Sequence, residues 1–259
     1  MSQETWKTGI TKIEPNKITV HGYSIDELMG KITFSQMIYL VLKGELPSEN
    51  VGKLMDAIFV SSVDHGVTPP STLAALTVAS TGAELNAALA TGILSINKFH
   101  GGAIESAMRI FNDIKAYSDE KGVSIEDAVK EVITAMREEK KVVFGFGHRI
   151  HKQDPRTVKL FDLAKEYGVA GDFVKIATES VSVLKEVTGK DLPLNVDGAM
   201  AAILCDLDFA PQYGNLFFTL SRIAGLAAHI FEEKERFRPM RKIDPFNWEY
   251  DGAKPRTLE

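Results

Sequence analysis

Two histidines lie in segments with two glycines each, where the backbone can come close to a ligand. The first, His100, stands in the segment 99–103 (Phe-His-Gly-Gly-Ala), between an apolar stretch and a predicted helix over 102–117. Its ring and the exposed amides of the helix start could both face a ligand. A tight turn whose glycines serve only the backbone is the alternative, and this segment alone favours it.

The second histidine, His148, belongs to the segment 145–149 (Gly-Phe-Gly-His-Arg), which is closely followed by Asp154-Pro155-Arg156. Asp154 can cap a helix that has Pro155 at its first position. Arg156 then lies in the first turn, beside the positive end of the helix, which suits an anion. A solvated loop with an ordinary cap explains the pattern about equally well.

A carboxylate, Asp197, precedes the apolar run 199–204 in the segment 194–198 (Leu-Asn-Val-Asp-Gly). A simple N-terminal cap is the interpretation that this pattern favours by itself. A carboxylate next to so much apolar surface could instead have a raised pKa and act as a base.

Three further basic residues stand in unusual contexts. Arg222 lies within the helical segment 216–230, which is otherwise nearly uncharged. A buried guanidinium needs a partner, either a ligand carboxylate or a structural salt bridge. Arg238, in an Arg-Phe-Arg-Pro turn, and His65, in an Asp-His-Gly turn, have simpler alternatives: a solvated loop and a polar helix terminus.

Composition and spacing exclude several classes of function. The formal net charge of -5, without a basic stripe, argues against a nucleic-acid partner. No cluster has metal-ligand spacing, and the glycines of 145–147 are not a dinucleotide fingerprint because no βαβ unit surrounds them. The single Cys205 allows neither an intrachain disulfide nor a Cys-based zinc site. The polar segment 1–11 lacks a signal core and no apolar run approaches a membrane span, so we expect a cytoplasmic protein without a bound metal.

Helical periodicity through most of the chain indicates which elements position these residues. Weak alternation around Glu14-Pro15-Asn16 predicts a short hairpin over 8–13 and 17–21. The predicted helices begin at caps Thr33, Ser48 and Ser124 or cover 72–81, 84–97, 102–117, 155–167, 173–188, 196–208 and 213–235. The helices over 72–81 and 84–97 have few charges and are expected to be buried. The predicted fold class is all-α with a short N-terminal β-hairpin.

Taken in order, these motifs resemble those of the citrate synthase family: His-Gly-Gly-Ala, Gly-Phe-Gly-His-Arg with Asp-Pro-Arg, Asn-Val-Asp, Ser-Arg and Arg-Pro. The resemblance covers about residues 20 to 240. Each motif alone is weak, but five in the right order are specific. The resemblance implies a shortened citrate-synthase-like helical fold, a single unit over 1–259. Its large domain would be 1–147 and 196–259, with a small subdomain over 148–195.

The resemblance also implies a role for each motif residue. His100 would hydrogen-bond the thioester oxygen of an acetyl-CoA enolate, His148 would serve the oxygen of the other fragment, and Asp197 would exchange a proton with the acetyl carbon. The carboxylates of oxaloacetate or citrate would be held by His65, Arg156, Arg222 and, from a partner subunit, Arg238. The residues expected near coenzyme A are Phe144, Gly145, Phe146, Gly147, Arg149 and Lys152. Coenzyme A would be part of the substrate, with no tightly bound cofactor.

The chain departs from a typical citrate synthase at several points. Only residues 48–63 separate the Gly-Glu-Leu-Pro segment from the Asp-His motif, where the family has a longer helical segment. Ser62 stands nearest to where a further histidine is usual, and Gly66 replaces the usual glutamate. The short form and the Asp-His-Gly motif are similar to citryl-CoA lyase and to the citrate-synthase-like module of ATP-citrate lyase.

We therefore expect the protein to cleave citryl-CoA to acetyl-CoA and oxaloacetate. We expect it to be a homo-oligomer, at least a dimer, and to receive citryl-CoA from a separate citryl-CoA synthetase. A minimal citrate or 2-methylcitrate synthase is the alternative within the family. A non-catalytic module that binds CoA esters or scaffolds a complex is the alternative of another class. The combined presence of His100, His148 and Asp197 argues against such a module. We expect neither nucleic acid nor membrane as a partner.

Overall fold

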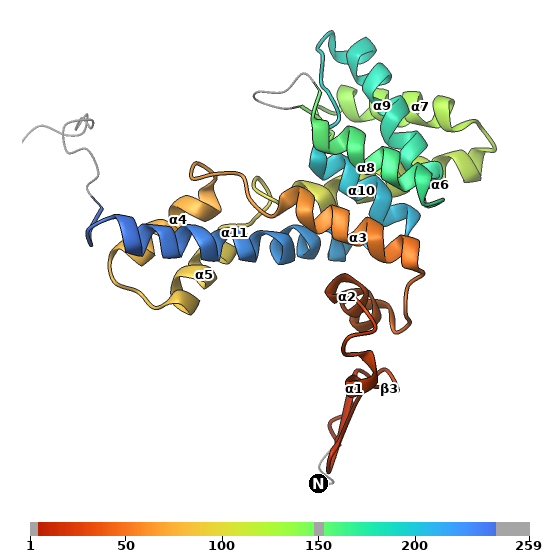
Figure 1. Cartoon of the computed structure of the whole chain (residues 1–259). Coiled ribbons are helices and arrows are strands. Elements are labelled where there is room, and N and C mark those ends of the chain that lie inside the picture. The colour runs from red at the N-terminus through yellow and green to blue at the C-terminus, as the bar shows by residue number, and fades with distance from the viewer. Residues whose placement is uncertain (1–4, 148–152, 242–259) are drawn as a thin grey trace, which may run out of the picture. The chain divides into compact units, whose positions relative to one another are not determined.

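The computed structural model describes residues 5–147 and 153–241, which are mainly helical. These ranges contain eleven α-helices and one small antiparallel sheet at the N-terminal end (Figure 1). The predicted fold class, all-α with an N-terminal hairpin, is confirmed. None of the described helices combines the length and the apolarity needed to cross a membrane.

The sheet consists of β1 (Thr11–Glu14), β2 (Lys17–Val20) and β3 (Tyr23–Ser24), in that order. The hairpin prediction holds, although β1 begins at residue 11 rather than 8. The short β3 was not predicted, since two residues are too few to show alternation. Its turn is made by His21 and Gly22, both with left-handed backbone angles (φ 46° and 87°).

Ten of the eleven described helices follow the predicted order, with ends that differ by a few residues, and the short helix over 25–28 was not predicted. The helices are α1 (Ile25–Leu28), α2 (Phe34–Lys43), α3 (Glu49–Ser62), α4 (Pro70–Ser80), α5 (Leu85–Leu94), α6 (Ala103–Lys121), α7 (Ile125–Glu138), α8 (Pro155–Glu166), α9 (Asp172–Thr188), α10 (Val196–Asp206) and α11 (Gly214–Arg236). The expected caps are present: Thr33 accepts from the Gln36 amide in a capping box, and Ser48 accepts from the Val51 amide.

The chain forms two compact units. Among the described residues, the first comprises 5–65, 96–147 and 153–225, and the second comprises 66–95 and 226–241. Helix α11 contributes its first half to one unit and its second half to the other. The predicted small subdomain over 148–195 has different boundaries and stays a prediction.

Helix α10 lies at the centre of the first unit, where it packs against α3, α6, α8 and α9 (Figure 1). Its buried residues are Val196, Gly198, Ala199, Met200, Ala201, Ala202, Ile203, Leu204 and Cys205. Small side chains let the neighbouring helices come close to its backbone. The two residues of α10 outside this buried set are Asp197 and Asp206, one near each end. The helix therefore holds one carboxylate near each end of its buried stretch.

In the second unit, α4 and α5 pack against each other and on the last part of α11. The core residues of this unit are Ala75, Ala79, Ala88, Leu226 and Ile230. The expected burial is correct for much of α4 but wrong for α5, in which only Ala88 and Gly92 are buried. Leu94 is 77% exposed. The reason is that α5 covers its neighbours with one face only, and its other face, although uncharged, is open in the single chain.

Candidate active site

His100 lies in the tight loop between α5 and α6. Backbone hydrogen bonds join Asn97 and His100 in both directions, each 2.8 Å long. Gly101 has φ 75°, and a Cβ on Gly102 would lie 2.6 Å from the Asn97 carbonyl oxygen. The two glycines thus serve the backbone, as the simpler interpretation held. In doing so they fix the His100 ring at the start of α6, edge-on to Phe218 with ring centroids 5.7 Å apart.

The surroundings of His100 favour its neutral form. Burial lowers the pKa of His100, and the charges of Arg222 and His65 lower it further. The pKa of His65 is also lowered, by desolvation first and then by Arg156 and Arg222. A neutral imidazole can donate a hydrogen bond to a developing oxyanion without adding a charge of its own.

Arg222 is buried in the first half of α11, with 2% of its surface exposed. Its Nε donates to the Ser62 carbonyl oxygen at 3.0 Å, and its guanidinium carbon lies 4.6 Å from the centre of the Phe218 ring. Its Nη1 has no hydrogen-bond partner among the described residues. A buried donor without a partner is costly, so this arrangement favours a ligand carboxylate over a self-contained structural role.

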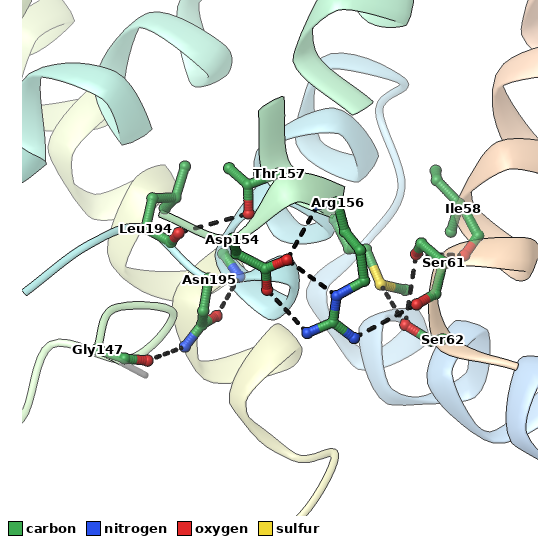
Figure 2. A network of polar contacts seen from close by, with 11 residues as sticks. Ile58, Ser61, Ser62, Gly147, Asp154, Arg156, Thr157, Leu194 and Asn195 are labelled. Atoms are coloured by element: carbon green, nitrogen blue, oxygen red, sulfur yellow. Dashed lines mark hydrogen bonds and ion pairs between the residues drawn. The ribbon is translucent and has the colours of Figure 1, made fainter. Parts of the chain in front are cut away.

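Arg156 is held by the residue that caps its own helix. Nε and Nη2 of Arg156 donate to the two carboxylate oxygens of Asp154, at 3.0 and 2.8 Å. Asp154 is buried and also accepts from the Arg156 backbone amide, which confirms the predicted cap of α8. Nη1 of Arg156 donates to the Ser61 carbonyl oxygen at 3.4 Å (Figure 2). Arg156 and Arg222 therefore both bind carbonyls at the negative, C-terminal end of α3.

Asp197 lies in the first turn of α10, but it is not the cap. The N-cap is Asn195, whose side-chain oxygen accepts from the Gly198 amide at 3.1 Å. The simple-cap interpretation of Asp197 is therefore wrong. Burial raises the pKa of Asp197 to about 6, against the lowering effect of Arg156 and Arg222. A carboxyl group with such a pKa can both take up and release a proton near neutral pH.

The segment 145–147 lies along the residues that lead into α10. Phe146 forms a bridge with Leu194, and the Gly147 amide donates to the Pro193 carbonyl oxygen at 2.7 Å. Phe146 also meets Phe111 edge-on. This segment thus has a packing role that the sequence did not indicate. The coenzyme A contacts expected of Phe144, Gly145, Phe146 and Gly147 stay a prediction. His148, Arg149 and Lys152 lie outside the described residues.

The structure brings five of the predicted residues into one electrostatic neighbourhood of the first unit. The five are His65, His100, Arg156, Asp197 and Arg222. The charge of Arg222 affects the pKa of His65, His100 and Asp197, and the charge of Arg156 affects the pKa of His65, Asp197 and Arg222. Arg238 follows α11 in the second unit and is exposed. Its role toward a substrate stays a prediction.

Two contributors to this neighbourhood were missed at the level of sequence. Asn195 is a strong N-cap residue type directly before a helix, so the capping rule could have identified it. Phe218 stands four residues before Arg222 on one helix, where side chains are neighbours. Among the described residues, no three His, Cys, Asp or Glu side chains gather in a way that could hold a metal ion.

A helical fold that brings neutral histidines, two arginines and a carboxyl group of raised pKa together suits proton exchange at carbon beside an anionic ligand. The chain belongs to the citrate synthase family: the family profile described as "Citrate synthase, C-terminal domain" matches residues 47–242.

Individual relatives agree with this membership. The chain is 29% identical to citrate synthase from Heyndrickxia coagulans over 81% of its length, and 33% identical to putative citrate synthase 2 from Mycobacterium bovis over 79%. These matches cover 55% and 52% of the two relatives. The chain thus spans about half the length of the curated relatives that it matches.

Two solved structures match over nearly the whole chain. Citryl-CoA lyase from Hydrogenobacter thermophilus is similar with a TM-score of 0.88 and 42% sequence identity, and the match covers 98% of this chain and 97% of that one. ATP citrate lyase from Methanosaeta concilii, solved with (3S)-citryl-CoA, matches with a TM-score of 0.82 over 98% of this chain and 43% of its own. At 20% identity, the second likeness concerns the fold alone.

Proposed function

We propose that this protein is a citryl-CoA lyase that cleaves citryl-CoA to acetyl-CoA and oxaloacetate. The observation that carries the proposal is the end-to-end match, at 42% identity, with citryl-CoA lyase from Hydrogenobacter thermophilus. Two features inside the chain, the short segment 48–63 and the Asp-His-Gly motif at 64–66, support the lyase over the synthase.

The proposed reaction breaks the bond between the acetyl methylene carbon and the carbon that bears the hydroxyl group. His148 or a water takes the hydroxyl proton as the carbonyl of oxaloacetate forms. The bonding electrons pass to the thioester, whose enolate oxygen accepts a hydrogen bond from neutral His100. Asp197, in its protonated form, then delivers a proton to carbon and completes acetyl-CoA. The lowered pKa of His100 and the raised pKa of Asp197 support these two roles.

The carboxylates of the citryl group are assigned to His65, Arg156 and Arg222, with Arg238 supplied by a second copy of the chain. The buried Nη1 of Arg222, which has no partner among the described residues, supports its assignment. Coenzyme A enters as part of the substrate, near Phe144–Gly147, Arg149 and Lys152.

We also propose that the protein is a homo-oligomer, at least a dimer, that works in the cytoplasm beside a separate citryl-CoA synthetase. The open face of α5 supports the oligomer, because the sequence of this helix has no charged residue and yet only Ala88 and Gly92 are buried in the single chain. Static light scattering tests this state. A monomer that is fully active at nanomolar concentration contradicts it.

The function is tested by incubating the purified protein with citryl-CoA and following oxaloacetate release, with Asp197→Asn as the inactive control. We expect many turnovers for the wild type. In a parallel assay with acetyl-CoA and oxaloacetate, we expect little free citrate or free CoA, because a lyase leaves the thioester intact.

Two outcomes contradict the proposal. If the protein forms citrate over repeated turnovers, at rates that match or exceed citryl-CoA cleavage, it is a minimal citrate synthase. If it instead forms 2-methylcitrate from propionyl-CoA in the same assay, it is a 2-methylcitrate synthase. Tight binding of citryl-CoA without any cleavage identifies a non-catalytic binding module.

A further inference from the structure

Asn195 uses both ends of its side-chain amide. Its oxygen accepts from the Gly198 amide at 3.1 Å and so caps α10. Its nitrogen donates to the carbonyl oxygen of Gly147 at 3.0 Å, across 48 positions of the sequence (Figure 2). Only one orientation of the amide satisfies both partners, because the cap requires an acceptor and the Gly147 carbonyl requires a donor.

The two segments that Asn195 joins are tied by backbone contacts as well. The Asn195 amide donates to the Gly145 carbonyl oxygen at 3.0 Å, and the Gly147 amide donates to Pro193. Gly145 and Gly198 touch through their backbones: a Cβ on Gly198 would lie 2.4 Å from the Gly145 carbonyl oxygen. The start of α10 and the segment 145–147 therefore form one closely packed piece of backbone.

The position of this contact in the sequence suggests what it does. Gly147 directly precedes His148, and Asn195 stands two residues before Asp197. The carbonyl that the Asn195 amide binds belongs to the peptide bond that enters His148. One side chain thus joins Gly147, which precedes His148 in the sequence, to the first turn of the helix that carries Asp197.

We propose that Asn195 is a positioning residue that holds the segment 145–147, which precedes His148 in the sequence, in register with the helix that carries Asp197. This inference rests on the proposed citryl-CoA cleavage. Two groups that must act on one substrate lose efficiency when either shifts by about 1 Å, on the order of 10²-fold. Both ends of the Asn195 side chain are engaged with the protein backbone, so in this role it affects turnover through the placement of other groups.

The test separates the cap from the link to Gly147. Asn195→Ser keeps a good capping side chain but is too short to reach the Gly147 carbonyl, whereas Asn195→Ala loses both contacts. Ser124→Ala is the matched control, because it removes the side-chain cap of α7, where Ser124 accepts from the Asp127 amide at 3.1 Å. For each variant, kcat and KM for citryl-CoA, the thermal midpoint and the deuterium exchange of the Gly147 amide are measured.

We expect Asn195→Ser to lower kcat roughly 10- to 100-fold, with KM changed less than about threefold and the thermal midpoint near that of the wild type. The Gly147 amide should exchange faster. Asn195→Ala should show the same loss of kcat and, in addition, a lower midpoint. Ser124→Ala should lower the midpoint while leaving kcat and the exchange of Gly147 unchanged.

An Asn195→Ser variant that keeps kcat within twofold of the wild type overturns the positioning role. If the wild type does not cleave citryl-CoA, the proposed function fails by itself. The deuterium exchange of the Gly147 amide then tests the restraint by Asn195 independently of activity. If this exchange is unchanged in Asn195→Ser, the hydrogen bond from Asn195 does not restrain the backbone at Gly147.

Discussion

The two ends of α10 present the same residue type in two different situations. Asp197 and Asp206 each lie beside the buried part of the helix, and burial raises the pKa of both. Asp206 accepts hydrogen bonds from the backbone amides of Gly171, Phe173 and Val174, at 2.9 to 3.0 Å. The pKa of Asp197 is shifted by burial and by charged groups, without a contribution from hydrogen bonds among the described residues.

The difference shows how one helix can serve structure at one end and chemistry at the other. At Asp206 the carboxylate caps the start of α9, a helix whose own cap position is a glycine without a side-chain acceptor. The Asp206 carboxylate oxygens are therefore engaged by backbone amides of the protein itself. Among the described residues, no hydrogen bond contributes to the pKa of Asp197, and the nearby Arg156 and Arg222 lower it by their charge. The predictions below test this contrast, beginning with the largest expected effect.

Asp197→Asn should lower turnover of citryl-CoA by roughly 10²–10⁴-fold, because the amide cannot deliver a proton to carbon. Folding should be intact, since the cap of α10 is Asn195 and not Asp197. Steady-state kinetics and circular dichroism check the two halves of this expectation. If turnover of the variant is near normal, Asp197 has no role in the mechanism. The contrast between a catalytic Asp197 and a structural Asp206 is then wrong.

The same variant should be more stable than the wild type above pH 6. The pKa of Asp197 is 3.8 when unperturbed and about 6 in the folded protein. The folded state therefore binds more protons between these values, and stability falls as the pH rises from about 4 to 6. Above pH 6 the full cost of burying the charged Asp197 carboxylate is present, about 2–3 kcal/mol of folding free energy, and Asp197→Asn removes this cost.

Urea unfolding at pH 4, 6 and 8 checks this expectation. The stability gain of Asp197→Asn should be largest at pH 8 and should vanish toward pH 4. A gain that is equal at all three values indicates that burial of the charged form is not the cause.

Arg222→Lys should weaken binding of oxaloacetate or the citryl group by roughly 10- to 100-fold, with little change in affinity for CoA. Lysine keeps the charge but loses the planar guanidinium that can hold a carboxylate with two hydrogen bonds. Arg156→Lys should behave similarly. Isothermal titration with oxaloacetate and with CoA measures both affinities. If Arg222→Lys instead mainly lowers the thermal midpoint and leaves the kinetics alone, the structural salt-bridge interpretation is correct.

Asp206→Ala should lower the free energy of unfolding by about 1–2 kcal/mol, because three backbone amides lose their acceptor. Turnover per folded molecule should stay within twofold of the wild type. Thermal unfolding and active-site-normalised kinetics test the two statements. A loss of turnover without a loss of stability contradicts the structural role assigned to this end of the helix.

Helix positions were largely predictable because their signals are local. Thr33, Ser48 and Asp154 are N-cap residue types directly before periodic apolar segments, and all three cap the helices expected of them. The exposure of α5 was not predictable, since an uncharged helix looks the same in sequence whether its own chain or a second copy covers it.

The candidate site divides in the same way. Residue types and their order indicated His65, His100, Arg156, Asp197 and Arg222 and the chemistry that they suit. The sequence did not indicate that Asp154 occupies Arg156 with two hydrogen bonds, that Phe218 lies against both His100 and Arg222, or that Asn195 reaches Gly147.

What the sequence determined by itself is therefore the helices, their caps and the types of group available for catalysis, because these depend on residues a few positions apart. Only the tertiary structure decided the protonation of those groups and which of their hydrogen-bonding atoms have partners within the protein. The pKa of Asp197, the open Nη1 of Arg222 and the two-way link of Asn195 arise from burial and from partners tens of positions away in the chain. Desolvation and charge depend on distance in space, and distance in space is set by how the helices pack around α10.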